Sequence, residues 1–303
     1  MELLYHLEKI RLPVLNEFML GITYLGDEIA FLVVALILIW CVDKRIGYYV
    51  LSVGFLGTIA NQFMKLWFRI PRPWVLDENF TILEQAREGA GGYSFPSGHT
   101  QSSVGTFGSI AYTTKNRTIR WLCIAAAVLV PFSRMYIGVH TPLDVGVAAV
   151  MAMILVFALK SPILGENKRV FPAFLGIMVA VSIAFLCFVE LYQFPADIDP
   201  HNMESGLKNA YTLIGAILGM VVVYLVDETW LHFPTEAAWW AQIIKVAVGL
   251  GIVLAVKNGL KAPIEGLMGN FIGRAVRYFL VVIVAGVIWP LTFWWFAKLG
   301  KKE

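Results

Sequence analysis

Charged residues are scarce in this chain of 303 residues, of which only 15% are Asp, Glu, Lys or Arg while 58% are hydrophobic. Soluble domains carry about 25% charged residues, and a soluble protein of this length could not bury so much apolar surface. Positive charge is not in excess either, because 24 Lys and Arg face 21 Asp and Glu. A formal net charge of +3 is too small for nucleic-acid binding, so no nucleic-acid partner is expected.

Cysteine is also rare, and its positions exclude two further classes. Three cysteines lie singly within apolar runs, where each is expected to be a small buried hydrophobic residue: Cys41, Cys123 and Cys187. They have neither the spacing of metal ligands nor the pattern of a disulfide framework. The chain has no H-x-x-x-H pair and no carboxylate cluster around its histidines. Neither a metal nor another cofactor is therefore expected.

The chain does contain many apolar runs of about 16 to 25 residues, the length that crosses a bilayer core roughly 30 Å thick. The fold class predicted is an all-α polytopic membrane protein with about nine transmembrane helices. The expected spans are approximately 27–42, 46–66, 97–114, 119–138, 142–160, 170–193, 207–227, 238–257 and 275–297. The N-terminal stretch has scattered glutamates and no uninterrupted apolar core, so it is not a cleavable signal. Its apolar residues at helical spacing predict an interfacial amphipathic helix: Leu3, Leu4, Leu7 and Ile10.

The basic residues between the spans predict the orientation in the membrane, because cytoplasmic loops are enriched in Lys and Arg. With nine spans, the following residues fall on one side, which is then cytoplasmic: Lys44, Arg45, Lys115, Arg117, Arg120, Lys160, Lys168, Arg169, Lys298, Lys301 and Lys302. The 67–96 loop and the 138–142 turn then face the extracytoplasmic side. The basic 257–277 connection falls on that side too, against the rule.

Polar residues with catalytic potential occur in three segments: LWFRIPRP after Lys65, SFPSGHTQSS around His99, and SRMYIGVHTPLD around His140. On the predicted topology, all three segments lie at the extracytoplasmic face. Less than a hundred residues thus bring together two histidines, one carboxylate and three cations. Membrane anchoring alone does not explain why these six charged and titratable residues occur at one face.

These residue types suit a phosphoryl group. Arginine gives bidentate contacts to phosphate and lysine a point charge, which indicates phosphate binding by Lys65, Arg72 and Arg134. Ser97 and Gly98 open a helix, whose N–H groups and positive dipole end favour an anion.

The third segment predicts a histidine nucleophile. Thr141 and Pro142 form a helix start, which places Asp144 in the first turn, close to His140. A carboxylate that accepts a hydrogen bond from one ring nitrogen fixes the tautomer and leaves the other nitrogen as the nucleophile. His99 is then the general acid for the leaving oxygen.

The three segments resemble, in order and spacing, the signature motifs of the type 2 phosphatidic acid phosphatase superfamily. This superfamily includes lipid phosphate phosphatases, undecaprenyl diphosphate phosphatases, glucose-6-phosphatase and vanadium-dependent haloperoxidases. The resemblance covers roughly residues 20–160. It implies a metal-independent phosphatase with His140 as phosphohistidine nucleophile, Asp144 as its partner and His99 as acid. It assigns phosphate binding to Lys65, Arg72, Ser97, Gly98 and Arg134.

The resemblance divides the chain into a catalytic core, residues 1–160, and residues 161–303, whose helices partly complete the core and partly form an extra C-terminal bundle. The substrate partner expected is a phosphorylated lipid in the outer leaflet. A bacterial inner or plasma membrane is favoured, because the tail KLGKKE does not resemble a retention signal.

Other functions stay open. A soluble sugar phosphate, as for glucose-6-phosphatase, would need a polar cup, which loop 74–95 could supply with Asp77, Glu78, Glu84 and Arg87. A transporter or flippase could use the same phosphate cradle for binding, although few charges lie deep in the spans. A haloperoxidase is disfavoured by the hydrophobicity.

Overall fold

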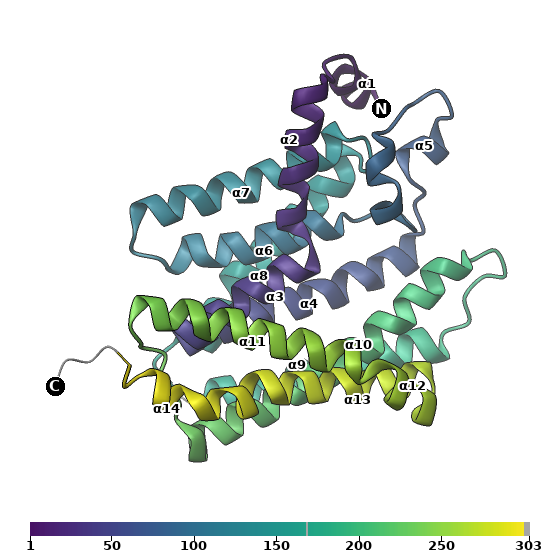
Figure 1. Cartoon of the computed structure of the whole chain (residues 1–303). Helices are drawn as coiled ribbons and strands as arrows, with labels where there is room; N and C mark the ends of the chain where they lie inside the picture. Colours follow the sequence, from purple (N-terminus) through teal and green to yellow (C-terminus); the bar gives the residue numbers. More distant parts are fainter. Residues whose placement is uncertain (168, 300–303) are drawn as a thin grey trace. The chain divides into compact units, whose positions relative to one another are not determined.

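The computed structural model describes residues 1–167 and 169–299, and within them it contains helices and no β-strand (Figure 1). The α-helices are α1 (Glu2–Lys9), α2 (Pro13–Thr23), α3 (Glu28–Ile37), α4 (Lys44–Phe68), α5 (Pro73–Leu76), α6 (Gly98–Thr113), α7 (Arg117–Tyr136), α8 (Pro142–Leu164), α9 (Val170–Leu191), α10 (Pro200–Val226), α11 (Trp239–Gly259), α12 (Lys261–Met268), α13 (Asn270–Ile283) and α14 (Phe293–Phe296). Short 3₁₀ and π segments extend some of them at Tyr24–Gly26, Leu38–Val42, Asp227–Leu231, Val284–Ile288 and Trp289–Thr292, and two further 3₁₀ turns, Glu84–Ala86 and Glu88–Ala90, lie in the loop between α5 and α6.

The all-α membrane class is confirmed, but the count of nine spans is not. Six helices are long and apolar enough to cross a membrane: Arg117–Tyr136, Pro142–Leu164, Val170–Leu191, Pro200–Leu231, Trp239–Met268 and Asn270–Phe296. The bent pair Pro13–Gly26 and Glu28–Val42 would make up to seven. Among the described residues, the predicted spans 46–66 and 97–114 are helices α4 and α6, which do not qualify, and α6 has only 16 residues.

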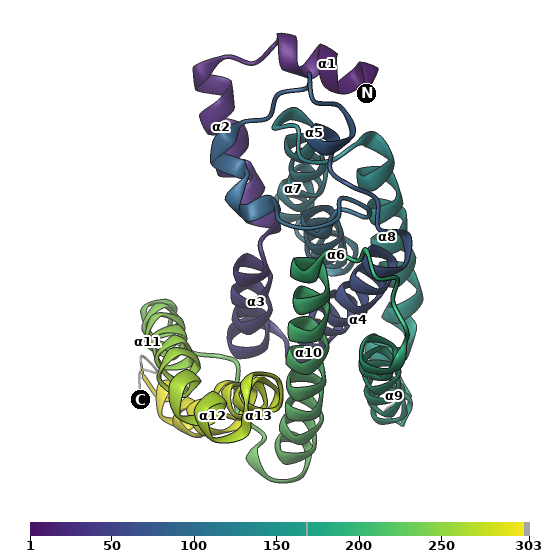
Figure 2. The same ribbon diagram turned by 90° about the vertical axis from the view of Figure 1, so that its right-hand side faces the viewer.

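The chain forms two units, and the polar segments singled out above all belong to the first. Unit 1 consists of residues 1–32, 49–161 and 193–206. Within it α6 and α7 run side by side in both views (Figure 2), and they are antiparallel because only residues 114–116 connect them. Capping fixes their starts: Ser97 Oγ accepts the N–H of Thr100, and Asn116 Oδ1 accepts that of Ile119.

The N-terminal amphipathic helix is present as α1, and its buried face packs against protein. Leu4 lies in a buried cluster with Phe80 and Ile82 from the loop that follows α5. Arg11, just after α1, donates from Nε to the carbonyl of Tyr136 at 3.0 Å. The N-terminal segment therefore covers the loop that precedes α6.

Unit 2 consists of residues 33–48, 162–192 and 207–303, and in it α11 and α13 pack together. Its buried charges are paired internally. Lys44 forms an ion pair with Asp227 at 2.6 Å. Lys245 on α11 is fully buried and donates to the carbonyls of Trp40 and Thr235 at 2.8 and 3.1 Å. These contacts provide hydrogen-bond and ion-pair partners for polar groups, which lipid chains could not provide.

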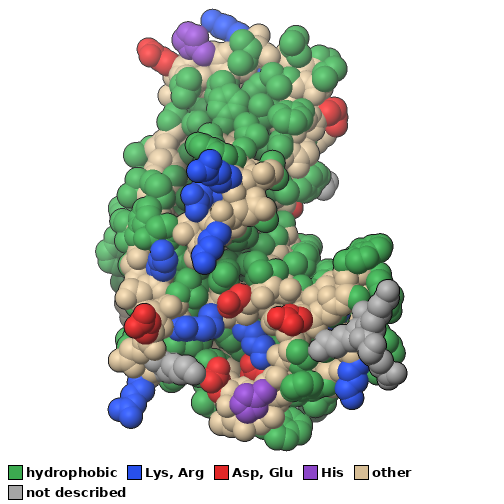
Figure 3. Space-filling view, turned by 90° about the vertical axis from the view of Figure 1, so that its left-hand side faces the viewer, with side chains coloured by type: hydrophobic (Ala, Val, Ile, Leu, Met, Phe, Trp, Pro, Cys, Tyr) green, Lys and Arg blue, Asp and Glu red, His purple; other side chains and the backbone are tan. Residues whose placement is uncertain are grey.

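Hydrophobic side chains cover much of the face seen in Figure 3, as a membrane protein requires. On α7, Trp121 and Leu122 expose about two thirds of their surface. The expectation of three buried cysteines is correct only for Cys123, since Cys41 is half-buried and Cys187 is exposed on apolar helix α9. Three of the basic residues used for orientation lie outside the described residues: Lys168, Lys301 and Lys302.

Candidate active site

Four of the predicted site residues lie at helix ends of unit 1. Lys65 lies in the last turn of α4 and Arg134 in the last turn of α7, whereas His99 and Asp144 lie in the first turns of α6 and α8. His140 is in the turn between α7 and α8. The charges of Arg72, Arg134, Lys65 and His99 all act on His140, so the structure brings these five side chains together.

His140 is buried, with 2% of its surface exposed, and its two ring nitrogens have different partners. Nε2 lies 3.0 Å from Arg72 Nη1, which can only donate, so Nε2 carries the lone pair. Nδ1 then carries the proton. Burial, and after it the positive charges around the ring, hold the pKa of His140 well below its usual range. The imidazole is therefore neutral near pH 7, the form in which it is a nucleophile.

Ser94 links His140 to Asp144, a link that the spacing of the third motif could not reveal. The carboxylate lies 3.6 Å from His140 Nδ1, too far for the direct hydrogen bond expected from the sequence. The hydroxyl of Ser94 lies 3.3 Å from Nδ1 and donates to Asp144 Oδ2 at 2.5 Å. Ser94 is fully buried. The Ser94 hydroxyl can thus accept a hydrogen bond from the Nδ1–H of His140 while it donates its own hydrogen bond to Asp144. In this way Ser94 connects the ring to the carboxylate.

Asp144 is itself fixed by a reciprocal cap at the start of α8. Its N–H donates to Thr141 Oγ1 at 3.2 Å, and its Oδ2 accepts the N–H of Thr141 at 2.7 Å. This is a capping box with aspartate in the position of glutamate. The predicted start of this helix at Thr141-Pro142 is confirmed. One carboxylate oxygen therefore caps the helix and binds Ser94.

Arg72 is buried and is held by backbone carbonyls on three sides. It donates to Gly91, Gly92 and Val139 at 2.9, 3.0 and 3.0 Å. Burial lowers the pKa of Arg72 to about 10, which still leaves the guanidinium charged at neutral pH. Lys65 is fixed similarly, by a 2.6 Å hydrogen bond to the carbonyl of Tyr93. Both cations are thus positioned by the same loop, residues 91–93.

Arg134 is the third cation, and it is only partly satisfied. Its Nη1 donates to Thr23 Oγ1 at 2.8 Å. Its Nε is buried and has no hydrogen-bond partner among the described residues. An unpaired buried N–H of a charged group is costly, and a bound anion would satisfy it. This atom supports phosphate binding by Arg134.

His99 has a partner that the sequence did not suggest. Its Nε2 lies 2.7 Å from Asp27 Oδ1, a carboxylate that lies outside the three motifs. Gly26 permits this contact, because a Cβ there would lie 2.9 Å from that of His99. The start of α6 thus packs directly against the residues that precede α3.

The start of α6 offers fewer free N–H groups than the sequence predicts. The N–H of Ser97 already donates to the carbonyl of Asp144 at 3.1 Å. The next two groups, on Gly98 and His99, open the helix and are available to an anion. A Cβ on Gly98 would meet only Asn61 Oδ1, at 3.8 Å, so protein atoms do not require glycine there. Asn61 does not bind Lys65; it donates to the carbonyl of Pro96 at 3.2 Å.

A residue far along the chain fixes the 91–93 loop. Asn202, near the start of α10, accepts the N–H of Tyr93 at 2.7 Å. Its side chain also packs against Gly92, whose φ of +75° favours glycine. No motif marks Asn202, and only its place in unit 1 reveals it.

Three of the four residues considered for a polar cup bind elsewhere. Asp77 accepts a hydrogen bond from Tyr5 at 2.8 Å, and Glu84 forms an ion pair with Arg87 at 2.7 Å on the surface. On α6, Gln101 and Ser103 are buried, whereas Ser102 is partly exposed. Within the ranges described, no group of three or more His, Cys, Asp or Glu could hold a metal ion.

Comparison with known proteins agrees with a phosphatase. The family model described as PAP2 superfamily matches residues 45–167, and that described as PAP2 superfamily phosphatase, transmembrane extension, matches residues 211–302. Undecaprenyl-diphosphatase BcrC of Bacillus subtilis (strain 168) is 33% identical, over 48% of this chain and 72% of the relative. Phosphatidylglycerophosphatase B of the same organism is 30% identical, over 50% of this chain and 76% of the relative. The crystal structure of Aquifex aeolicus LpxE, at 28% identity, covers 52% of this chain and 92% of its own, with a TM-score of 0.47.

The two family models and the two Bacillus relatives define the class as integral-membrane phosphatases. The chain belongs to the PAP2 superfamily, the type 2 phosphatidic acid phosphatases that its three motifs resemble. It also carries the transmembrane extension of that superfamily.

Proposed function

We propose that this chain hydrolyses a phosphate monoester or diphosphate of a lipid by transferring the phosphoryl group to His140. The observation that carries the proposal is the environment of His140 Nε2. It is the lone-pair nitrogen of a buried, neutral ring, and it faces the Arg72 guanidinium with Lys65 and Arg134 nearby. A neutral nucleophile surrounded by cations is suited to attack a negatively charged phosphorus centre.

In the first step, Nε2 forms a bond to phosphorus while the bond between phosphorus and the leaving oxygen breaks. His99 gives a proton to that oxygen, so the product leaves as an alcohol or a phosphate. The phosphorylated ring carries positive charge, which Asp144 stabilises through Ser94. In the second step, water attacks the phosphohistidine, His99 takes a proton from the water, and inorganic phosphate leaves with both histidines restored.

Positioning and charge compensation supply the rest of the catalysis, as expected for phosphoryl transfer. Arg134 Nε and the N–H groups of Gly98 and His99 would bind the non-bridging oxygens. Arg72 would turn its Nη1 from the His140 lone pair to the phosphate. Ser97 takes part in two ways. Its hydroxyl caps the start of α6, and its N–H donates to the carbonyl of Asp144, which holds the start of α6 against α8. This cycle requires no metal ion.

A lipid substrate and an extracytoplasmic site are both part of the proposal. Two relatives are named for undecaprenyl diphosphate and phosphatidylglycerophosphate, which are phosphorylated lipids. Each helix that carries site residues has basic residues at or just beyond its other end: Lys44, Arg45, Lys115, Arg117, Arg120 and Lys160. The positive-inside rule then places those ends in the cytoplasm and the site on the opposite side. A bacterial inner or plasma membrane fits the bacterial relatives.

The test is phosphate release by purified protein in detergent with EDTA throughout. Substrates would be phosphatidic acid, phosphatidylglycerophosphate, undecaprenyl diphosphate, sphingosine phosphate and glucose 6-phosphate. We expect the wild type to hydrolyse at least one lipid and His140→Ala to hydrolyse none. The matched control is His6→Ala, because His6 is exposed on α1 and bonds only to the carbonyl of Glu2.

A trapping experiment checks the intermediate. His99→Asn should slow both steps, and a substrate labelled in its phosphate should leave acid-labile label on a peptide that contains His140. If glucose 6-phosphate were the only compound hydrolysed, the substrate would be a soluble sugar phosphate and not a lipid. Turnover that EDTA abolishes, or that His140→Ala retains, would contradict the mechanism.

A further inference from the structure

The transmembrane extension contains a basic connection whose charge the phosphatase function does not explain. Residues 257–277 join α11 to α13 through α12, and these three helices pack together within unit 2 (Figure 2). The connection carries four cations, Lys257, Lys261, Arg274 and Arg277, and one carboxylate, Glu265. Its net charge is therefore as large as the +3 of the whole chain.

Orientation in the membrane does not explain these cations. Lys245, in the second turn of α11, donates to the carbonyl of Trp40, which lies just before Lys44. The start of α11 is thus at the Lys44 end of unit 2. The 21 residues of α11 extend about 32 Å, close to the thickness of a bilayer core, so Lys257 lies at the other end. With Lys44 in the cytoplasm, the positive-inside rule predicts few cations at that other end.

Protein groups neutralise little of this charge. Arg277 is buried, forms an ion pair with Glu265 at 2.8 Å and donates to the carbonyl of Lys257 at 3.0 Å. Within the part of the chain that the structure describes, Lys257, Lys261 and Arg274 have no ion-pair partner. Three positive charges therefore lack a counter-charge at the end where α11 meets α12 and α13.

Arg277 also has an unused hydrogen-bond donor. Its side chain is only 4% exposed, and its Nε is buried without a partner among residues 1–167 and 169–299. Lys257 and Arg277 both lie near the ring of Tyr278, at 5.9 and 5.1 Å from its centroid, so one ligand can reach both. A bound anion would satisfy this N–H and offset the unpaired charges.

Apolar side chains next to the cations indicate what kind of anion binds. Leu267, Met268 and Ile272 expose 82%, 46% and 57% of their surface. They flank Gly269, whose φ of +81° allows the chain to turn from α12 into α13. A free phosphate ion gains nothing from such neighbours, whereas a phospholipid presents a phosphate and hydrocarbon chains together.

We infer that the 257–277 connection binds the headgroup of an anionic phospholipid that is not the substrate. The phosphate lies at the four cations, and the hydrocarbon chains lie against Leu267 and Ile272. All residues of this site belong to unit 2, whereas the phosphatase site belongs to unit 1. The inference therefore does not depend on the proposed phosphatase function.

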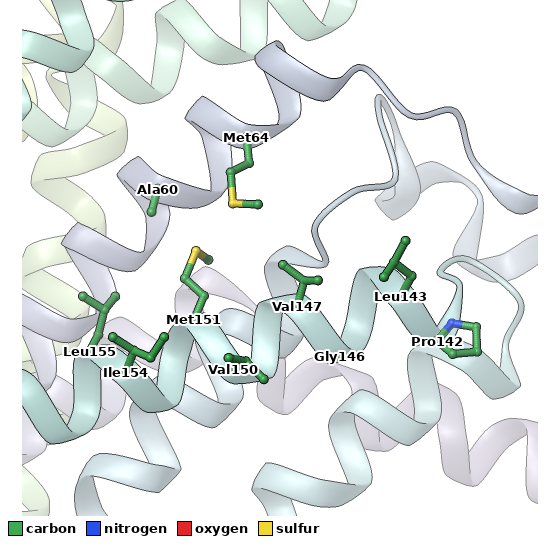
Figure 4. Close-up of a pocket in the computed structure, with 10 residues that line it drawn as sticks. All are labelled: Ala60, Met64, Pro142, Leu143, Gly146, Val147, Val150, Met151, Ile154 and Leu155. Carbon is green, nitrogen blue, oxygen red and sulfur yellow. The ribbon is translucent and has the colours of Figure 1, made fainter.

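The apolar groove between α4 and α8 of unit 1 offers a contrast. Met64 and Met151 point toward one another across it (Figure 4), and none of its lining residues is charged. Such walls offer nothing that distinguishes an anionic from a zwitterionic headgroup. Gly146→Phe, which places a large side chain in this groove, is therefore a control for headgroup recognition.

Native mass spectrometry of the purified full chain with phosphatidylglycerol tests the inference. This lipid is a phosphodiester, without a terminal phosphate that a phosphatase could remove. We expect one phosphatidylglycerol to bind more tightly than phosphatidylcholine. Its dissociation constant should rise about 30-fold in Lys261→Gln/Arg274→Gln, the effect of two cations near a membrane surface. Lys115→Gln/Arg117→Gln is the matched control, because it removes two exposed cations near the turn between α6 and α7.

The control pair and Gly146→Phe should bind as the wild type does, and so should Lys261→Arg/Arg274→Lys, which keeps both charges. The same preference should persist in His140→Ala, so the result does not depend on turnover. Excess inorganic phosphate should not displace the lipid. Displacement by phosphate, equal affinity for phosphatidylcholine, or an equal loss in the control pair would overturn the inference.

Discussion

At the scale of single residues, the site depends on which ring nitrogen of His140 is free. Arg72 faces Nε2 of His140, and Ser94 faces Nδ1. One tautomer satisfies both contacts, with the proton on Nδ1. Asp144 influences the ring chiefly through the Ser94 hydroxyl, since the direct distance is 3.6 Å. Ser94 is thus a positioning residue for the nucleophile.

Ser94→Ala should lower kcat about 10- to 100-fold, the loss typical of a removed partner that orients a histidine, with little change in KM. The buried Nδ1–H would lose its acceptor, and the alternative tautomer would put the proton on the attacking nitrogen. Ser94→Thr retains the hydroxyl and should recover part of the activity. The control is Ser103→Ala, since Ser103 is equally buried but donates to the carbonyl of Thr100. Equal effects of both alanines on kcat would refute this role.

Asp27 should act on the leaving group through His99, because its carboxylate lies 2.7 Å from Nε2. Asp27→Asn should slow release of alcohols, which need a proton, by about 10- to 100-fold. Release of p-nitrophenol, which leaves without protonation, should hardly change. Glu28→Gln is the neighbouring control, as Glu28 is exposed. A loss of equal size for both leaving groups would indicate that Asp27 is only structural.

At the scale of elements, the sequence predicts what is local. Lys65, His99, His140 and Asp144 were predicted as site residues because helix ends have recognisable spacing and caps, and Thr141-Pro142 starts α8 as predicted. Asp27, Ser94 and Asn202 carry no such signal. Their partners are 72, 50 and 109 residues away, so only folding pairs them. The count of nine spans is not confirmed, because α6 has only 16 residues and α4 carries charged residues such as Lys65.

The 91–93 loop is the element that aims two cations, and Asn202 holds it from outside the motifs. Asn202→Ala should therefore raise KM several-fold and lower kcat/KM about tenfold, by releasing carbonyls that bind Arg72 and Lys65. Asn167→Ala is the control, since Asn167 likewise accepts a backbone N–H, that of Arg169, at 3.1 Å. Unchanged kinetics in a folded Asn202→Ala variant would show that the loop holds itself.

At the scale of the whole molecule, the site has a cost in stability that depends on pH. His140 is buried among Arg72, Arg134, Lys65 and His99, with Asp144 opposite, so the folded state resists its protonation. The unfolded chain protonates this ring near pH 6.5. Where the folded pKa is the lower one, the unfolded state binds more protons below pH 6.5, and stability falls as the pH falls. Above pH 6.5 the ring is neutral in both states and contributes no pH dependence.

Thermal unfolding of the wild type and of His140→Gln in detergent should measure this effect. Between pH 7.5 and 5.5, the midpoint of the wild type should fall further than that of His140→Gln, which has no proton to gain at this position. All other titrating groups are common to both proteins, so the difference between the two slopes isolates His140. Parallel slopes would mean that His140 protonates equally easily in the folded protein, and the neutral nucleophile proposed here would lose its physical basis. The same nitrogen that weakens the fold in acid is thus the one kept free for phosphorus at neutral pH.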